Sequence, residues 1–304
     1  MGTTYRILYF DERHHRNFGP AVDSILIKVN KSISTYDPTS EISRFNRSER
    51  GISTKDFYFC DLLHRSKAIY EASDGAFDPT VLPLVNAWGF GPDDADTLSQ
   101  KKVDSLREFI GFAKVRISGE KIRKKMGGVQ LDMGGIGQGY GVDMVFNFLK
   151  TKGISDMLVE LGGEGMASGR NLTKGKPWMI GILDPNSTRE NQYFKAYVAV
   201  EDQSFTTSGN YFNYRMINGR KYGHTIDPAS GYPVQHALLS ASVFAKDCTT
   251  ADGWATAFMV MGLEKAIEKS KTLSNLEAVF MYEEANGNVE VYITPGIKNQ
   301  VKLE

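Results

Sequence analysis

The sequence predicts an α+β fold, with a largely antiparallel sheet and packed helices. Segments in which apolar residues recur at helical spacing lie mostly before residue 155, and short segments with strand-like alternation gather after it. Helices and strands that are segregated along a chain in this way are typical of α+β proteins. The 304 residues contain no visible linker or internal repeat, which suits one large domain or two packed subdomains.

The charge balance argues against one broad class of function. Lys and Arg together number 36, as do Asp and Glu, so the formal net charge is zero. Proteins that bind nucleic acid by neutralising phosphates carry an excess of basic residues, so we expect no nucleic-acid partner. No run of about 18 apolar residues occurs, so we expect no membrane span. The two cysteines, Cys60 and Cys248, lack the spacing of a zinc site and are expected to be buried free thiols.

The first half of the chain is predicted to be mainly helical. The expected elements are a strand at 5–10, helices at 21–34 and 57–72, a short helix at 101–112, and a hairpin at 115–117 and 121–123. Ser40, Ser43 and Asn46 offer caps and turns between the first two helices. Residues 92–100 are acidic and polar, and we expect them to form a surface insertion.

Two segments of this half have the composition of a binding-site lining. Residues 76–91 fit neither a helix nor a strand, because two prolines, Trp88 and Asp78 interrupt a short apolar stretch. Irregular, aromatic-rich loops of this kind often line sites. The other segment is residues 33–46, in which the ring of Tyr36 could cover a flat ligand. Its local sequence alone favours the alternative, which is a surface turn with a tyrosine in the core.

The stretch from Leu131 to Asp143 organises the chain. It contains five glycines, at positions 134, 135, 137, 139 and 141. Val129 and Leu131 are typical of the end of a buried strand, and apolar residues recur at helical spacing over 142–149. Glycines allow a ligand to approach the backbone, and a helix N-terminus attracts phosphate. We interpret the stretch as a strand, a phosphate-binding turn and a helix start, with Asp132 at the entrance. A tight turn without a ligand explains the glycines alone equally well.

Strands dominate the second half. We expect strands at 157–161, 178–182, 194–200, 211–216 and 238–245 and two within 277–293, with helices at 251–261 and 263–271. Thr250 is expected to cap the first of these helices. Asp252 and Thr256 share one face of it, because they are four residues apart. A carboxylate and a hydroxyl together suit a hard cation such as Mg²⁺. The local sequence slightly favours a structural alternative, in which Asp252 stabilises the helix start and Thr256 bonds to a backbone carbonyl.

Taken together, these segments resemble the ApbE family, the FAD:protein FMN transferases, over most of the chain. Each motif is weak alone, and seven or eight in the right order are specific. The segments that carry the resemblance are Met1-Gly2-Thr3, Ser34-Thr35-Tyr36, Glu41 to Asn46, Gly75 to Thr80, Trp88 to Gly91, Leu131 to Tyr140, Gly162-Gly163-Glu164, Thr207 to Asn210, Tyr222 to Pro228 and Ala251 to Ala257. The resemblance implies a single domain over residues 1–304, made of two intertwined subdomains.

The resemblance also implies roles for individual residues. The positions that match FAD contacts are Met1, Tyr36, Ala76, Phe77, Asp78, Asp132, His224 and Ile226. Asp252, Thr256 and the backbone carbonyl of Gly135 match the Mg²⁺ ligands, and His224 matches a proposed base. Gln138 stands where the family usually has a lysine. Its amide can form a hydrogen bond with FAD but brings no charge.

The implied reaction moves FMN from FAD to a threonine hydroxyl of an acceptor protein and releases AMP. Mg²⁺ would neutralise the charge of the pyrophosphate, and His224 would accept the proton of the hydroxyl. The expected acceptor is a subunit of a membrane redox complex. Two alternatives stay open: a metal-dependent pyrophosphatase that splits FAD into FMN and AMP, and a non-catalytic flavin-binding protein. Asp252, Thr256 and His224 favour either enzyme over the latter.

The resemblance further implies where the native protein works. We expect a periplasmic or otherwise extracytoplasmic protein that is tethered to the membrane by a lipid. The lipid would be carried on a cysteine in a leader that precedes Met1.

Overall fold

A seven-stranded sheet forms the centre of the fold. The structure is a computed structural model that describes residues 2–12, 15–92, 98–188, 190–211, 214–217 and 220–304. In spatial order the strands are β1 (Tyr5–Tyr9), β5 (Met157–Leu161), β6 (Glu164–Ser168), β9 (Ser204–Gly209), β12 (Leu238–Ala245), β13 (Leu276–Glu283) and β14 (Val289–Ile293). Each neighbouring pair is antiparallel, which confirms the predicted α+β class.

The first strand interlocks the two halves of the chain. β1 comes from the N-terminus but pairs with β5, with Tyr5 opposite Leu161 and Tyr9 opposite Met157. A sheet that is otherwise built from the second half therefore takes its edge strand from the first half.

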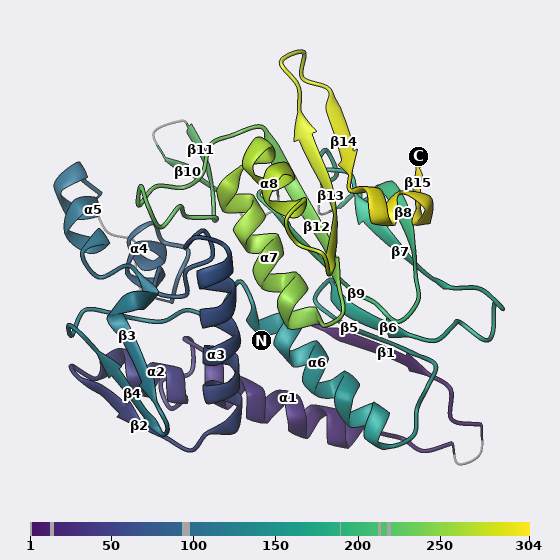
Figure 1. Ribbon diagram of the computed structural model, residues 1–304, viewed down its shortest axis with the longest axis horizontal. Coiled ribbons are helices and arrows are strands. Elements are labelled where there is room, and N and C mark those ends of the chain that lie inside the picture. Colours follow the sequence, from purple (N-terminus) through teal and green to yellow (C-terminus); the bar gives the residue numbers. More distant parts are fainter. Residues whose placement is uncertain (1, 13–14, 93–97, 189, 212–213, 218–219) are drawn as a thin grey trace.

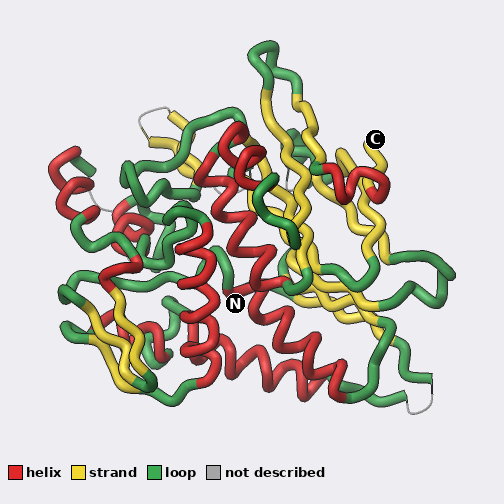
Figure 2. Tube along the Cα trace, in the orientation of Figure 1, coloured by secondary structure: helices red, strands yellow, loops and turns green. Residues whose placement is uncertain are grey.

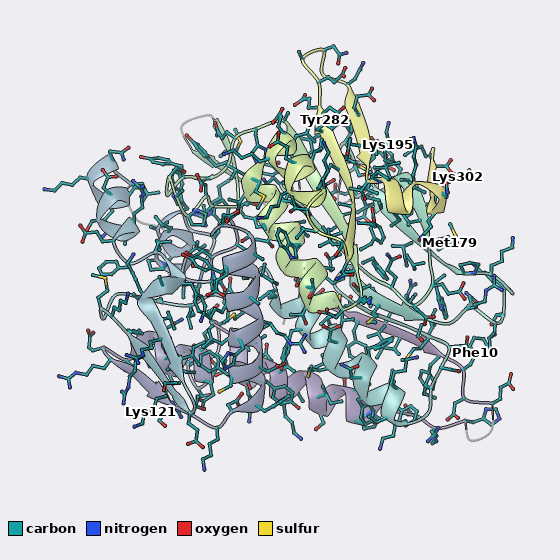
Figure 3. The ribbon with its side chains drawn as sticks, viewed as in Figure 1. Phe10, Lys121, Met179, Lys195, Tyr282 and Lys302 are labelled. Carbon is teal, nitrogen blue, oxygen red and sulfur yellow. The ribbon has the colours of Figure 1, made fainter. Side chains whose placement is uncertain are left out.

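The described residues form three further, smaller sheets around the central one (Figure 1). They are β2-β4-β3 (Gly51–Ser53, Lys121–Lys124 and Val115–Ser118), β15-β8-β7 (Val301–Leu303, Phe194–Val200 and Trp178–Leu183), and the hairpin of β10 (Tyr214–Ile217) and β11 (Arg220–Gly223). Figure 3 shows Met179, Lys195 and Lys302 on the β15-β8-β7 sheet, at the edge of the molecule away from α3.

Four of the helices described below, α1, α3, α6 and α7, lie between the central sheet and the β2-β4-β3 sheet (Figures 1 and 2). The helices are α1 (Gly19–Ile33), α2 (Glu41–Arg47), α3 (Phe57–Ala72), α4 (Leu82–Ala87), α5 (Gln100–Arg107), α6 (Gly137–Thr151), α7 (Cys248–Met261) and α8 (Leu263–Ser270), with short 3₁₀ turns at Phe112–Lys114 and Pro295–Gln300. No helix in the described ranges is long and apolar enough to cross a membrane.

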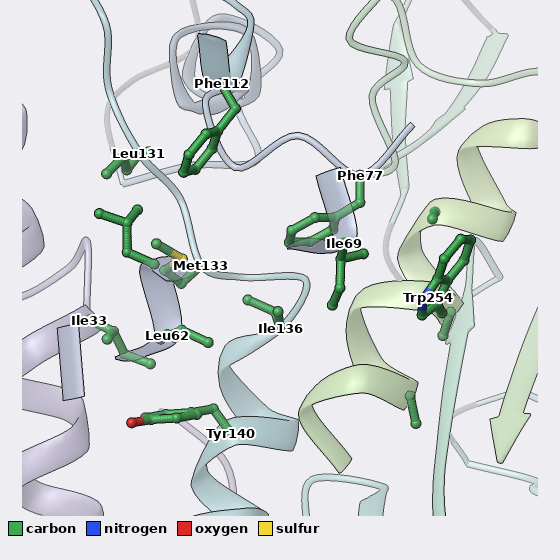
Figure 4. Packing of buried hydrophobic residues seen from close by; sticks show 14 of the residues in the cluster. Ile33, Leu62, Ile69, Phe77, Phe112, Leu131, Met133, Ile136, Tyr140 and Trp254 are labelled. Carbon is green, nitrogen blue, oxygen red and sulfur yellow. The ribbon is translucent and has the colours of Figure 1, made fainter. Parts of the chain in front are cut away.

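The central sheet is buried on both faces because its strands alternate between two cores. On β12, Val243 packs in the core shared with the helices, and Phe244 packs in the core shared with β7 and β8. The helix-side core continues beneath the glycine-rich segment, where Leu131, Met133 and Ile136 are buried (Figure 4). The glycine-rich segment is therefore anchored by a continuous apolar layer.

The strand predicted at Val129 and Leu131 is wrong. Both side chains are fully buried, but the only ladder contact there is an isolated bridge between Gln130 and Val81. Asn46 fixes the segment instead: its side-chain amide donates to Leu131 O (2.9 Å) and its oxygen accepts from Leu131 N–H (2.8 Å). Two buried apolar residues before a glycine run are typical of a strand end, which explains the wrong prediction. The hydrogen bonds from the Asn46 side chain, which replace strand pairing here, cannot be recognised from local sequence.

Several element boundaries also differ from expectation. α6 begins at Gly137, inside the glycine run, and α4 forms within the loop predicted to lack regular structure. Asp247 rather than Thr250 caps α7, because its carboxylate accepts the Thr250 N–H (2.9 Å). Cys248 is a buried free thiol as expected, whereas Cys60 is only half-buried. Residues 93–97 of the predicted insertion and 212–213 of the predicted strand lie outside the described residues.

Candidate active site

One cavity of about 790 Å³ gathers most of the predicted site residues. Its walls come from the turn after α1, the 76–92 segment, the glycine-rich segment, the end of β9, residues 224–228 and α7. The predicted site residues that line it are Tyr36, Ala76, Phe77, Asp78, Asp132, Gly135, Gln138, His224, Ile226, Asp252 and Thr256. Met1 lies outside the described residues. Positions up to 220 residues apart in the sequence (36 against 256) are thus brought together by the fold.

Backbone hydrogen bonds position Asp132 at the cavity. Its N–H donates to Pro79 O (2.7 Å), which ties the glycine-rich segment to the 76–92 segment. Its carboxylate accepts the Gly134 N–H (3.0 Å). Burial raises the pKa of the Asp132 carboxyl, and the hydrogen bonds from Gly134 and Met133 oppose that rise.

The three predicted metal ligands lie on one wall, where α7 meets the start of α6. Thr256 Oγ1 donates to Gly135 O (3.1 Å), and Asp252 Oδ2 accepts the Gly139 N–H (2.8 Å). A Cβ atom on Gly135 would lie 2.7 Å from Thr256 Oγ1, so a larger residue there would displace the Thr256 side chain. All three contribute oxygen atoms, which is the donor type that Mg²⁺ prefers. The residues present therefore fit such a cation.

The structural alternative for Asp252 and Thr256 is realised in an unexpected form. Asp252 does stabilise a helix start, but that of α6 rather than that of its own helix. Thr256 does bond to a carbonyl, but to that of Gly135 rather than to one in α7. The anion at the N-terminus of α6 is thus the carboxylate of Asp252, and the glycine run serves both packing and the cavity wall.

Burial dominates the electrostatics of this wall. It is the main cause that raises the pKa of Asp252 to about 7, with the charge of Asp143 adding to the rise and the Gly139 N–H opposing it. Glu164 lines the cavity nearby, and burial followed by the charge of Asp252 raises the pKa of its carboxyl. The charge of Asp252 therefore acts on Glu164 within the same cavity lining.

The cavity is rich in carboxylates and poor in cations. Its acidic residues are Asp78, Asp132, Glu164 and Asp252, and Arg215 is the only lysine or arginine among the described residues of the lining. No group of three or more His, Cys, Asp and Glu side chains in the described ranges is arranged to hold a metal. A cation here would depend on one or two carboxylates together with neutral oxygens.

Aromatic rings flank the entrance. The Tyr36 side chain is 71% exposed and borders the cavity, so the alternative of a core tyrosine is wrong. Phe77 is buried on the inner side. The Phe90 ring lies 6.5 Å from the His224 ring and 6.0 Å from the Arg215 guanidinium carbon. Flat apolar surface is therefore available beside the polar wall.

Polar residues are among those of the lining that sequence reasoning missed. Glu164, Thr207 and Ser208 stood in segments that carried the family resemblance, but no role was assigned to them. Arg215 had no signal, because it lies in a segment predicted only as a strand. The signal for Glu164 was its place directly after two glycines, Gly162 and Gly163, both of which adopt positive φ (68° and 111°).

Comparisons with known proteins agree with these motifs. The model of the ApbE family matches residues 1–280. An FAD:protein FMN transferase of Haemophilus influenzae is 34% identical over 306 residues, covering 95% of this chain and 86% of that protein. Its Escherichia coli K12 counterpart is 30% identical, covering 98% and 86%.

Solved structures agree as well. The flavin transferase ApbE from Vibrio cholerae superposes with a TM-score of 0.88 at 30% identity, over 99% of this chain and 96% of that one. The apo form of the Pseudomonas stutzeri flavinyl transferase ApbE gives 0.87 at 34% identity, over 99% and 94%.

Proposed function

The chain belongs to the ApbE family, and from this premise we propose that it transfers FMN from FAD to a hydroxyl group of an acceptor protein, with release of AMP. The observation that supports this most is the single cavity, in which an oxygen-rich wall adjoins exposed aromatic surface. FAD combines a charged pyrophosphate with a flat ring, so one cavity offers a partner for each part.

The polar wall is the proposed place of the pyrophosphate. Asp252, Thr256 and the carbonyl of Gly135 would hold Mg²⁺, whose contribution is to neutralise charge as the P–O–P bond breaks. Gln138 lies beside this wall and can donate hydrogen bonds from its amide to phosphate oxygens. Tyr36 and Phe77 would flank the isoalloxazine ring.

His224 is the proposed base. It lines the same cavity as Asp252 and Thr256, and an imidazole can accept a proton near neutral pH. It would take the proton from the threonine hydroxyl as the oxygen attacks the FMN-side phosphorus. AMP then leaves, and FMN stays attached to the acceptor through a phosphoester. Asp78 and Asp132 would orient FAD, since both are fixed by neighbouring donors.

A hydrolase is the second candidate, because water can replace the acceptor hydroxyl as the nucleophile. One observation favours it: the Tyr36 side chain, which lines the cavity, is exposed to solvent, so this part of the cavity is in contact with water. An assay with FAD, Mg²⁺ and an acceptor protein separates the two. Transfer predicts an acceptor heavier by FMN less one water, together with one AMP per FMN attached. AMP and free FMN without any change in acceptor mass would show hydrolysis, and no AMP at all would contradict both.

The acceptor and the location of the native protein are also proposals, and they rest on the family alone. We propose that the acceptor is a subunit of a membrane redox complex and that the native protein is extracytoplasmic, held at the membrane by a lipid. Expression of the native gene with its own upstream region tests the location. Recovery in the membrane fraction, released by detergent and not by high salt, is expected, whereas recovery with cytoplasmic markers would contradict it.

A further inference from the structure

Glu164 is a buried carboxylate without a role in the proposed reaction. It is the first residue of β6, opposite Leu161 across a tight turn. Its Oε2 atom is shielded from solvent and has no hydrogen-bond partner among the described residues. A buried carboxylate oxygen that lacks a partner is costly, and native proteins normally pair such an atom with a donor or a cation.

The surroundings of Glu164 lack such a cation. None of the ion pairs in the described part of the chain involves Glu164 or Asp252. Gln138 reaches the same turn, since a Cβ on Gly162 would lie 2.2 Å from its Nε2, but its amide brings no charge. The charged group that acts most strongly on Glu164 is Asp252, and it has the same sign.

The position of Glu164 links it to the wall formed by α7. Both it and Asp252 line the cavity, together with Gly135 and Thr256. Two buried like charges that line one cavity repel each other unless a cation or a proton offsets them. A divalent cation bound at Asp252 would offset both charges at once.

We propose that Glu164 supplies a second carboxylate to the divalent cation held by Asp252, Thr256 and the carbonyl of Gly135. This inference rests on the proposed function, since it extends the same metal site. Mg²⁺ binds through one or two carboxylates and retains water molecules in its remaining positions, so a second carboxylate from β6 is compatible with its chemistry.

Calorimetry with Mn²⁺ alone, in the absence of nucleotide, tests the inference on the intact protein. Glu164→Gln removes the charge at nearly constant volume and should weaken Mn²⁺ binding by about tenfold or more. Glu160→Gln is the matched control. Glu160 lies on β5 outside the cavity, and a glutamine there can still accept the Gly163 N–H (2.7 Å). Its effect should stay within about twofold, as expected for a charge that does not ligate.

Thermal melting in EDTA supplies a readout independent of metal binding. Above neutral pH, Glu164→Gln should melt at a higher temperature than wild type, because the repulsion from Asp252 is removed. Added Mn²⁺ should then raise the melting temperature of wild type more than that of the variant. A variant that melts earlier in EDTA would indicate that Glu164 only holds its turn, and would overturn the inference.

Asp252→Asn separates this inference from the proposed site. If it loses Mn²⁺ binding and Glu164→Gln binds like wild type, Glu164 is not a ligand and only the inference fails. If Asp252→Asn itself binds Mn²⁺ like wild type, the proposed metal site is wrong and the inference fails with it.

Discussion

Two buried aspartates lie at the contact between α6 and α7, and they have opposite surroundings. Asp143 of α6 accepts the N–H groups of Cys248 (2.8 Å) and Thr249 (2.9 Å) and the Thr249 hydroxyl, at the start of α7. Asp252 of α7 accepts the Gly139 N–H at the start of α6 and also lines the cavity. Each helix therefore caps the other, but only one of the two carboxylates is sealed inside the protein.

The comparison shows how one arrangement provides both stability and a site. Among the described residues, the Asp143 carboxylate has three donors and is absent from the cavity lining, so its capacity as an acceptor is used mainly by the fold. The Asp252 carboxylate has one such donor, so it has lone pairs left for a ligand. Residue type and burial alone do not separate the two, since their side chains are 3% and 6% exposed. The two aspartates differ in how many further hydrogen bonds or ligands each carboxylate can still accept.

The largest expected effect is the loss of catalysis in Asp252→Asn. The asparagine oxygen can still accept the Gly139 N–H, so the fold should be retained, and in EDTA the loss of repulsion from Glu164 should raise the melting temperature, as in Glu164→Gln. The charge that Asp252 brings to the proposed metal site is lost, and FAD cleavage should fall by roughly 10³-fold or more, an effect of several kcal/mol on the transition state. AMP release, followed by chromatography at saturating FAD and Mg²⁺, measures it. A near-native rate of AMP release would contradict the proposal that Asp252, unlike Asp143, holds the metal ion.

Asp143→Ala should have the opposite signature. It leaves the N–H groups of Cys248 and Thr249 buried without partners, which should lower the free energy of unfolding by about 2–4 kcal/mol. Urea unfolding measures the loss. Folded Asp143→Ala should bind Mn²⁺ within about twofold of wild type, because no ligand is removed. If stability is unchanged while Mn²⁺ binding is lost, the structural role of Asp143 is refuted.

The fold class and most of the cavity residues could be predicted from the sequence, but the tertiary hydrogen bonds that join the elements could not. Strand alternation after residue 155 predicted most strands, because each side chain there alternates between two cores. The spacing of Asp252 and Thr256 predicted a shared helix face. The reciprocal caps could not be predicted, since Asp143 and Cys248 are 105 residues apart and no local pattern signals a tertiary hydrogen bond. The bracket from Asn46 to Leu131 was missed for the same reason.

The pH dependence of the free energy of unfolding tests the surroundings of Asp143 in the absence of any ligand. Burial raises the pKa of Asp143 to about 6, well above its ordinary value. A carboxyl whose pKa is raised by folding favours the folded state below its unfolded pKa, and this contribution is lost as pH rises through about 6, by at most about 3 kcal/mol. In EDTA, wild type should therefore lose more stability between about pH 4 and pH 7 than Asp143→Asn does. Parallel profiles for the two proteins would contradict this assignment.

The smallest predicted effect concerns the space between the helices. A Cβ on Gly139 would lie 2.3 Å from Cys248 O and 2.7 Å from Asp252 Cβ, so Gly139→Ala must push the two helices apart. We expect a loss of about 1–3 kcal/mol, offset in part by the better helix propensity of alanine, which is worth about 1 kcal/mol. Gly253→Ala is the control, because its Cβ would meet the flexible end of the Ile69 side chain at 2.5 Å. Equal losses in chemical denaturation would indicate that the close backbone approach does not matter.

Anomalous diffraction from crystals soaked in Mn²⁺ tests the central claim most directly, namely that the Asp252 carboxylate holds a cation and the Asp143 carboxylate does not. The soak belongs above about pH 7, where Asp252 is ionised. We predict an anomalous peak within roughly 2–2.5 Å of Asp252, Thr256 Oγ1 and Gly135 O, the range of cation–oxygen bonds, and none at Asp143. An occupied Mn²⁺ site elsewhere in the cavity with these three atoms bare would contradict the account.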